Sequence, residues 1–205
     1  MSVEGEAELR RADLASDPLD QFRLWFAEAA DALSAPEAMA LATATPDAAP
    51  SVRMVLLKGA DERGLVFYSH HTSRKGRELE ANPQAALLFH WSPLGRQVRV
   101  EGRVEHVSAD ESDAYFATRP RDAQFGALAS RQSEPLGSRA ELEERVAEVE
   151  RDLGQDPVTR PATWGGLLLV PAAWEFWQHR ASRLHDRFRY EVEPSGGWRI
   201  DRLFP

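Results

Sequence analysis

The sequence predicts a mainly β protein with peripheral helices (α+β), built on an antiparallel, barrel-like sheet. About eight short apolar segments show the alternation of strands, and short turns rich in Gly, Pro and Asp join several of them. Two capping boxes, Ser108 with Glu111 and Ser138 with Glu141, open helices between the strands. We expect a flexible N-terminal arm over residues 1–15 and a single domain over residues 16–205.

The composition excludes several classes of protein. The chain has no cysteine, which excludes disulfides, thiolate metal sites and cysteine nucleophiles. With 33 acidic and 25 basic residues the net charge is -8, which argues against general nucleic-acid binding, although a local cluster of basic residues can still hold an anionic small molecule. The N-terminus does not resemble a signal peptide, and no segment reaches the ~18 apolar residues of a membrane span. We therefore expect a soluble, cytoplasmic protein.

The chain is expected to begin with a helix and an antiparallel meander. Ser16-Asp17-Pro18 is a helix-start signal, with proline at the first helical position. Strands are predicted over residues 39–45, 51–58 and 65–69, with turns between them. The apolar face of the helix comprises Leu19, Phe22, Trp25, Phe26, Ala29, Ala30 and Leu33.

A short helix is predicted next, capped by Thr72 or Ser73 and stopped by Asn82-Pro83. Its first turn carries Arg74 and Lys75, which have the wrong charge for the positive end of a helix dipole. This conflict either is a tolerated surface mismatch or indicates a phosphate site, because helix-start amides and two cations together bind phosphate.

The second half of the chain is predicted to alternate strands and helices. Strands are expected over residues 84–91 and 96–107, and the two capping boxes then begin helices that reach about residues 119 and 153, with a small-residue helix between them. The final strands are predicted over residues 164–170, 173–178, 184–192 and 198–203.

One concentration of charge lies near the C-terminus. If residues 184–192 and the residues just before them are extended, Arg183, His185 and Arg187 share one face of the strand. Three such groups in a row repel one another, so they are expected either in open water or against an anion.

The usual catalytic motifs are absent. The six histidines show no His-x-x-x-His pattern on a helix, so no metal site is expected, and the sequence has no nucleophile elbow, phosphate-binding loop or dinucleotide fingerprint. Basic residues instead occur in pairs next to strand ends or helix starts, and two phosphorylated ligands would account for them better than one. The pairs are Arg53 and Lys58, Arg74 and Lys75, Arg119 and Arg121, and Arg183 and Arg187.

A series of segments from about Leu14 to Pro205 resembles the pyridoxamine 5'-phosphate oxidase family, in order and with similar spacing. Any one segment is a weak signal, whereas the whole series is highly specific. The segments are 53–58 (RMVLLK), 67–69 (FYS), 73–75 (SRK), 96–98 (RQV), 115–116 (YF), 119–122 (RPRD), 132–133 (QS), 175–178 (EFWQ) and 183–187 (RLHDR).

The resemblance implies a homodimer of antiparallel split β-barrels that binds two FMN molecules at the subunit interface. It implies that substrate is bound by Lys58, Tyr115, Arg119, Arg183 and His185, with Arg183 and His185 nearest the chemistry. FMN would be held by Arg53, Met54, Val55, Leu56, Leu57, Lys58, Tyr68, Ser69, Arg74, Lys75, Gln97, Gln132, Ser133, Trp177 and Arg187.

The implied reaction is oxidation of pyridoxamine 5'-phosphate and pyridoxine 5'-phosphate to pyridoxal 5'-phosphate, by hydride transfer to the flavin and reoxidation by O2 to give H2O2. Because the cofactor supplies the redox chemistry, the protein's task is orientation and charge. Two alternatives stay open: a related FMN-dependent oxidase of the phenazine-biosynthesis type, and a non-enzymatic protein that stores flavin or pyridoxal phosphate.

Three positions depart from the family pattern. Ala123 replaces a serine that helps to hold the substrate phosphate, and losing that hydrogen bond costs roughly 1 kcal/mol. His179-Arg180 replaces a glycine-rich turn. The N-terminal arm lacks the Arg and Tyr that often help to cover the substrate.

Overall fold

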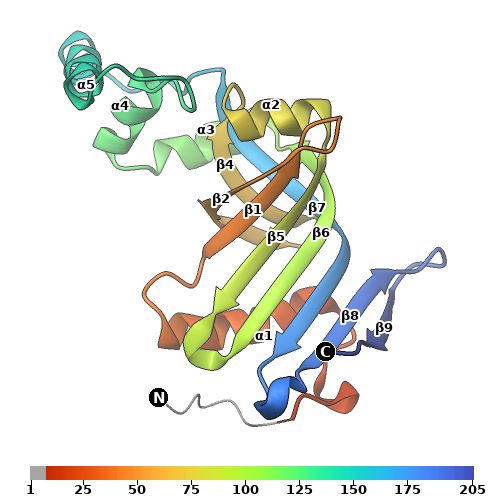
Figure 1. The fold of residues 1–205 in the computed structure, drawn as a ribbon. Helices are drawn as coiled ribbons and strands as arrows, with labels where there is room; N and C mark the ends of the chain where they lie inside the picture. The colour runs from red at the N-terminus through yellow and green to blue at the C-terminus, as the bar shows by residue number, and fades with distance from the viewer. Residues whose placement is uncertain (1–7) are drawn as a thin grey trace.

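The computed structural model describes residues 8–205, and its centre is one nine-stranded antiparallel sheet that curls into a half-barrel (Figure 1). The strand order is β2-β1-β5-β6-β7-β4-β3, and β8 pairs with both β7 and β9. This confirms the predicted mainly β fold with peripheral helices. The strands are β1 (Ala38–Ala44), β2 (Pro50–Leu56), β3 (Gly59–Asp61), β4 (Gly64–His70), β5 (Gln84–Trp91), β6 (Arg96–His106), β7 (Trp164–Gln178), β8 (Asp186–Val192) and β9 (Trp198–Arg202).

The helices begin where the sequence places their caps. Asp17, Ser73, Ser108 and Ser138 each accept a backbone N–H from the first turn of the helix that follows. These caps set the starts of α1, α2, α3 and α5. The α-helices are α1 (Pro18–Ala32), α2 (Arg74–Ala81), α3 (Ala109–Ala117), α4 (Arg121–Ala129) and α5 (Arg139–Leu153), and the short 3-10 helices are η1 (Arg11–Asp13), η2 (Ser92–Leu94) and η3 (Ala181–Arg183).

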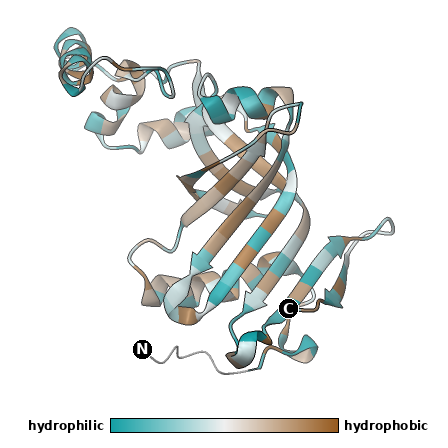
Figure 2. Ribbon diagram, viewed as in Figure 1, coloured by the Kyte–Doolittle hydropathy of each residue, from teal (hydrophilic) through white to brown (hydrophobic). Residues whose placement is uncertain are grey.

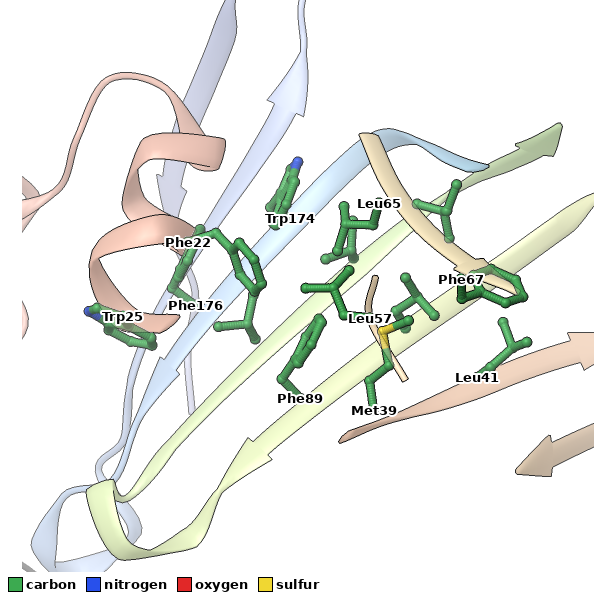
Figure 3. Packing of buried hydrophobic residues seen from close by; sticks show 14 of the residues in the cluster. Phe22, Trp25, Met39, Leu41, Leu57, Leu65, Phe67, Phe89, Trp174 and Phe176 are labelled. Carbon is green, nitrogen blue, oxygen red and sulfur yellow. The ribbon is translucent and has the colours of Figure 1, made fainter. Parts of the chain in front are cut away.

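The hydrophobic core lies inside the curled sheet, and α1 closes its lower end as drawn in Figure 1. Phe22 on α1 is almost fully buried, with its ring centroid 5.0 Å from that of Phe89 and 5.6 Å from that of Trp174 (Figure 3). Apolar and polar residues alternate along β6, whereas α5 is largely hydrophilic (Figure 2). Alternation therefore buries one face of β6 and leaves the other polar.

Strand β7 corrects the prediction of two separate strands over residues 164–170 and 173–178. It runs without interruption from Trp164 to Gln178, through Pro171. The register between the two strands shifts at Glu101 and Gly102 of β6, whose partners are Ala173 and Pro171, so β7 bulges by one residue there. A Cβ on Gly102 would lie 2.0 Å from the Val170 carbonyl oxygen. The bulge and the bare glycine let β6 follow the bend, so β7 links the two ends of the molecule.

The segment before β8 corrects a second prediction. β8 begins only at Asp186, and Arg183 lies in η3, where both it and Ser182 have positive φ values of 62° and 57°. Arg183, His185 and Arg187 therefore do not share one strand face. The left-handed turn reverses the chain after Arg180, and the alternation of a strand starts too late to align the three side chains.

Part of the predicted arm lies against β8. The backbone N–H of Leu9 donates to Asp186 Oδ2 at 3.1 Å, and the Tyr190 hydroxyl donates to the Ala15 carbonyl at 2.8 Å. The remainder of the arm, residues 1–7, lies outside the described residues, so the mobility of residues 1–15 stays a prediction. Among residues 8–205, no helix has the length and apolar character needed to cross a membrane.

Candidate functional site

A cavity of about 580 Å³ is lined by residues of β2, β4, the start of α2 and the α3–α4 junction. Ten predicted site residues line this cavity, although they are widely spaced along the chain. They are Met54, Val55, Leu56, Lys58, Tyr68, Ser69, Lys75, Tyr115, Arg119 and Gln132.

Lys75 is the buried cation on the α2 side of this cavity. Its ammonium donates to Ser69 Oγ at 2.9 Å and to Gln132 Oε1 at 2.9 Å, but it takes part in none of the ion pairs of residues 8–205. Burial, assisted by the nearby positive charge of Arg53, lowers the pKa of Lys75 to about 8. An anion placed here would gain a charge-assisted hydrogen bond and restore the charged form of the lysine.

Arg53 and Arg74 lie beside Lys75 and share one carboxylate. Arg74 Nε donates to Glu78 Oε1 at 2.8 Å, and Arg53 Nη2 donates to Glu78 Oε2 at 3.2 Å. The three cations come from β2 and from the first turn of α2, so the predicted group at this helix start is brought together. Helix-start amides and clustered cations are suited to a phosphate group.

Arg119 is a second, half-buried cation in the cavity, next to the α3–α4 junction. Its guanidinium carbon lies 4.8 Å from the Trp164 ring centroid, and among residues 8–205 its Nη1 is one of the buried side-chain atoms without a hydrogen-bond partner. Burial lowers the pKa of Arg119, and Tyr115 opposes that effect. A half-buried guanidinium with a buried, unpaired Nη1 is suited to an anionic group, because leaving a buried charged donor unpaired is costly.

α3 is shorter than the helix that was predicted to reach about residue 119. α3 ends at Ala117, so Arg119 lies beyond the helix rather than one turn after Tyr115 on the same face. Both side chains nevertheless line the cavity, because Tyr115 stacks on Tyr68 with ring centroids 3.9 Å apart and Arg119 stacks on Trp164. The aromatic rings form an apolar part of the cavity wall.

A second group of predicted site residues, the lower cluster, lies at the opposite end of β7. It consists of Gln97, Trp177, Arg183, His185 and Arg187. Trp177 pairs with Gln97 on β6 and with Arg187 on β8, and its ring centroid is 4.5 Å from that of His185. Arg187 Nε donates to the buried carboxylate of Glu175 at 2.8 Å.

His185 is held in one tautomer. Its Nδ1 accepts the backbone N–H of Arg180 at 3.1 Å, so in the neutral ring the proton is on Nε2. Burial, together with His179 and Arg183, lowers the pKa of His185 and favours that neutral form. The imidazole can therefore donate one hydrogen bond from Nε2.

The cavity and the lower cluster are far apart within one chain. Gly165, which pairs with Ser69, and Trp177 lie at opposite ends of β7, and about a dozen residues at ~3.3 Å each span roughly 40 Å along the strand. A single chain therefore does not bring the predicted residues into one site. Two further predicted residues lie outside the cavity: Leu57 packs in the core, and Ser133 lines a neighbouring hollow beside Arg131.

Sequence reasoning missed several residues of the site. His70 and Trp164 line the cavity, and the buried carboxylates Glu78 and Glu175 pair with predicted site arginines. Glu78 was detectable, because it follows Arg74 by four residues on a helix. No sequence pattern at His70 or Trp164 indicated that these residues would line the cavity. In the described part of the chain, no three His, Cys, Asp or Glu side chains form a group that could hold a metal ion.

Comparisons with known proteins cover nearly the whole chain. Residues 26–151 match the protein family described as pyridoxamine 5'-phosphate oxidase, and residues 164–205 match the pyridoxine 5'-phosphate oxidase C-terminal dimerisation region. Proteins named pyridoxine/pyridoxamine 5'-phosphate oxidase from Cupriavidus taiwanensis and Rubrobacter xylanophilus are 57% and 58% identical to this chain. The match covers 96% of the chain and 93% of the Cupriavidus protein, and 97% of the chain and 94% of the Rubrobacter protein.

Solved structures share the fold. PhzG from Burkholderia lata, in complex with tetrahydrophenazine-1-carboxylic acid, superposes with a TM-score of 0.91 at 34% identity, over 98% of this chain and all of the other. A pyridoxamine 5'-phosphate oxidase-related, FMN-binding protein from Nostoc punctiforme superposes with a TM-score of 0.73 at 17% identity, over 94% of this chain and all of the other, and this likeness supports the fold alone.

The electrostatics of the cavity predict an unusual titration. Lys75 should titrate near pH 8 in the ligand-free protein, because burial disfavours its charged form, and added inorganic phosphate should raise that pKa. Since Lys58 and Lys75 are the only lysines in the sequence, NMR of protein carrying isotope-labelled lysine gives two side-chain signals, which Lys75→Arg assigns. Titration of both lysines near the ordinary pKa of about 10.4 would contradict the described burial.

Proposed function

Because the chain belongs to the pyridoxamine 5'-phosphate oxidase family, we propose that it oxidises pyridoxamine 5'-phosphate and pyridoxine 5'-phosphate to pyridoxal 5'-phosphate. The cofactor is FMN and the electron acceptor is O2, which is reduced to H2O2. The observation that carries this proposal is the pair of cations in one cavity, the buried Lys75 and the half-buried Arg119, neither of which pairs with a carboxylate in residues 8–205. Two phosphorylated ligands in one cavity require two such groups.

We assign the α2 side of the cavity to the FMN phosphate, which Arg53, Arg74 and Lys75 would hold. The cavity wall from Met54 to Lys58, with Tyr68, Ser69 and Gln132, would hold the rest of the cofactor. When bound, FMN supplies the two-electron acceptor that none of the side chains provides.

The α3–α4 side is assigned to the substrate phosphate. Arg119 has a free buried donor for it, and Tyr115 and Lys58 line the same cavity. The stacked rings of Tyr68, Tyr115 and Trp164 exclude water from one side of the cavity, which strengthens each charged contact.

His185 and Arg183 are assigned to the substrate ring. With Nδ1 occupied by the Arg180 N–H, His185 presents Nε2–H, which can donate to the phenolic oxygen of the pyridine ring. Arg183 lies on the exposed left-handed turn next to it and can stabilise negative charge on the same oxygen. These two residues would orient the substrate ring and stabilise its phenolic oxygen, and neither is assigned as a general base.

The protein is a homodimer, and the site that we propose would need both copies of the chain. The C-terminal match is to a dimerisation region, and it contains four of the five residues of the lower cluster. On edge strand β2, the apolar side chains of Val52, Met54 and Leu56 are 69%, 64% and 44% exposed. A second copy that covers this row can bring its Trp177, Arg183, His185 and Arg187 to the cavity. We also propose a cytoplasmic location and a single domain over residues 16–205.

A phenazine-type oxidase is the second candidate. PhzG from Burkholderia lata is 34% identical to this chain, and Ala123 lines the cavity where the family pattern has a phosphate-binding serine. Against it, Arg119 retains its free donor, which suits a phosphorylated substrate.

An oxygen-consumption assay tests the function. Purified protein supplied with FMN should consume O2 with pyridoxine 5'-phosphate and release pyridoxal 5'-phosphate, which absorbs visible light. A colourless protein that takes up no FMN would contradict both oxidase proposals. Bound flavin without turnover would favour the phenazine-type enzyme or a storage protein.

Two arginine variants test the division of roles. Arg183→Ala should impair oxidation by about tenfold or more while FMN stays bound, because a charged hydrogen bond to the substrate ring is lost. Arg74→Ala should weaken FMN retention instead, because it removes a cation from the phosphate site. Flavin fluorescence measures retention and steady-state kinetics measure turnover. Loss of FMN from Arg183→Ala, with unchanged substrate binding, would show that the roles are reversed.

A further inference from the structure

Glu78 is a buried carboxylate at the centre of the cationic group beside the cavity. The residue is 5% exposed and lies on the second turn of α2. Its Oε2 accepts the hydroxyls of Thr43 and Ser51, both at 2.5 Å, and its ion pairs to Arg53 and Arg74 are 3.2 Å and 2.8 Å long. All four donors therefore converge on one side chain.

These contacts keep the carboxylate ionised. Burial alone raises the pKa of Glu78, but the hydrogen bonds from Ser51, Thr43, Arg74 and Arg53 outweigh it and lower the pKa to about 2. A permanent negative charge in a site for an anion is unexpected, because it repels the ligand that the cations attract.

The charges and the geometry resolve this conflict. Arg53, Arg74 and Lys75 carry three positive charges and Glu78 carries one negative charge, which leaves a net charge of about +2 to face a phosphate monoester of about -2. Arg53 is further held by donating from Nη1 to the Leu41 carbonyl at 3.2 Å and to Thr43 Oγ1 at 2.5 Å. Without Glu78, the two arginines would repel each other and lose a shared acceptor.

We propose that Glu78 is a positioning residue for the phosphate of the cofactor: it holds Arg53 and Arg74 in place before the ligand arrives. The inference rests on the proposed assignment of Arg53, Arg74 and Lys75 to the FMN phosphate. Holding the arginines in advance reduces the conformational entropy lost on binding, so Glu78 strengthens phosphate binding despite its own charge.

A purely structural role for Glu78 has a different consequence. Glu78 also links α2 to β1 and β2 through Thr43 and Ser51, so its removal could loosen the whole cavity. A loosened cavity would weaken the binding of any flavin, whereas misplaced arginines would weaken only a flavin that carries a phosphate. Riboflavin, which lacks the phosphate, separates the two cases.

The test compares dissociation constants of FMN and riboflavin, measured by quenching of flavin fluorescence on the full-length apoprotein. Glu78→Leu should weaken FMN binding by about tenfold or more, since two charged contacts lose their acceptor, and should leave riboflavin binding unchanged. Glu78→Gln keeps one acceptor oxygen and should show a smaller loss, about threefold. If Glu78→Leu does not fold, Glu78→Gln carries the test alone.

Glu80→Gln is the matched control, because Glu80 lies on the same helix with a side chain that is 78% exposed and should leave both constants unchanged. Equal losses for FMN and riboflavin, unchanged FMN binding, or tighter FMN binding in Glu78→Gln would each overturn the inference. Failure of the unaltered protein to bind FMN would instead overturn the proposed function.

Discussion

The bent, uninterrupted strand β7 is the constraint on which the arrangement of the site depends. The bulge at Gly102 allows β6 and β7 to stay paired around Pro171, because only a residue without a Cβ fits against the Val170 carbonyl. The strand therefore carries Gly165 to the cavity end and Trp177 to the opposite end of the molecule. The residues that we assign to one reaction are therefore separated within a chain, and the proposed site needs a second copy to complete it.

The second feature that organises the site is positive charge without a carboxylate partner. Lys75 is buried and Arg119 is half-buried, and neither has a carboxylate partner in the described residues. A protein recovers the cost of burying such charges when a ligand supplies the opposite charge. Glu78 has the opposite role: its buried carboxylate pairs with Arg53 and Arg74 and reduces the repulsion between them. The cavity thus has two cations without a carboxylate partner, Lys75 and Arg119. Beside it are two cations, Arg53 and Arg74, that are paired with Glu78.

Local signals in the sequence predicted most of the fold, whereas the family resemblance supplied the proposed site residues. Alternation located the strands, and side-chain caps located the helix starts. Two predictions of strand bounds were wrong. Pairing with β6 and a one-residue bulge in β7 keep β7 continuous through Pro171, and the left-handed turn at Ser182 and Arg183 moves the start of β8 to Asp186. Family resemblance assigned residues to one site, but spacing along the chain could not reveal that they lie at two ends.

The most direct test of this account is complementation between two inactive variants. Arg119→Ala damages the cavity and Arg183→Ala damages the lower cluster, so a heterodimer that carries one of each, purified through two different tags, should regain about half of the unaltered activity, since one of its two sites is intact. A heterodimer of Arg119→Ala with Lys75→Met, both in the cavity, should stay inactive. Absence of recovery in the first heterodimer would contradict a site built from the opposite ends of two chains.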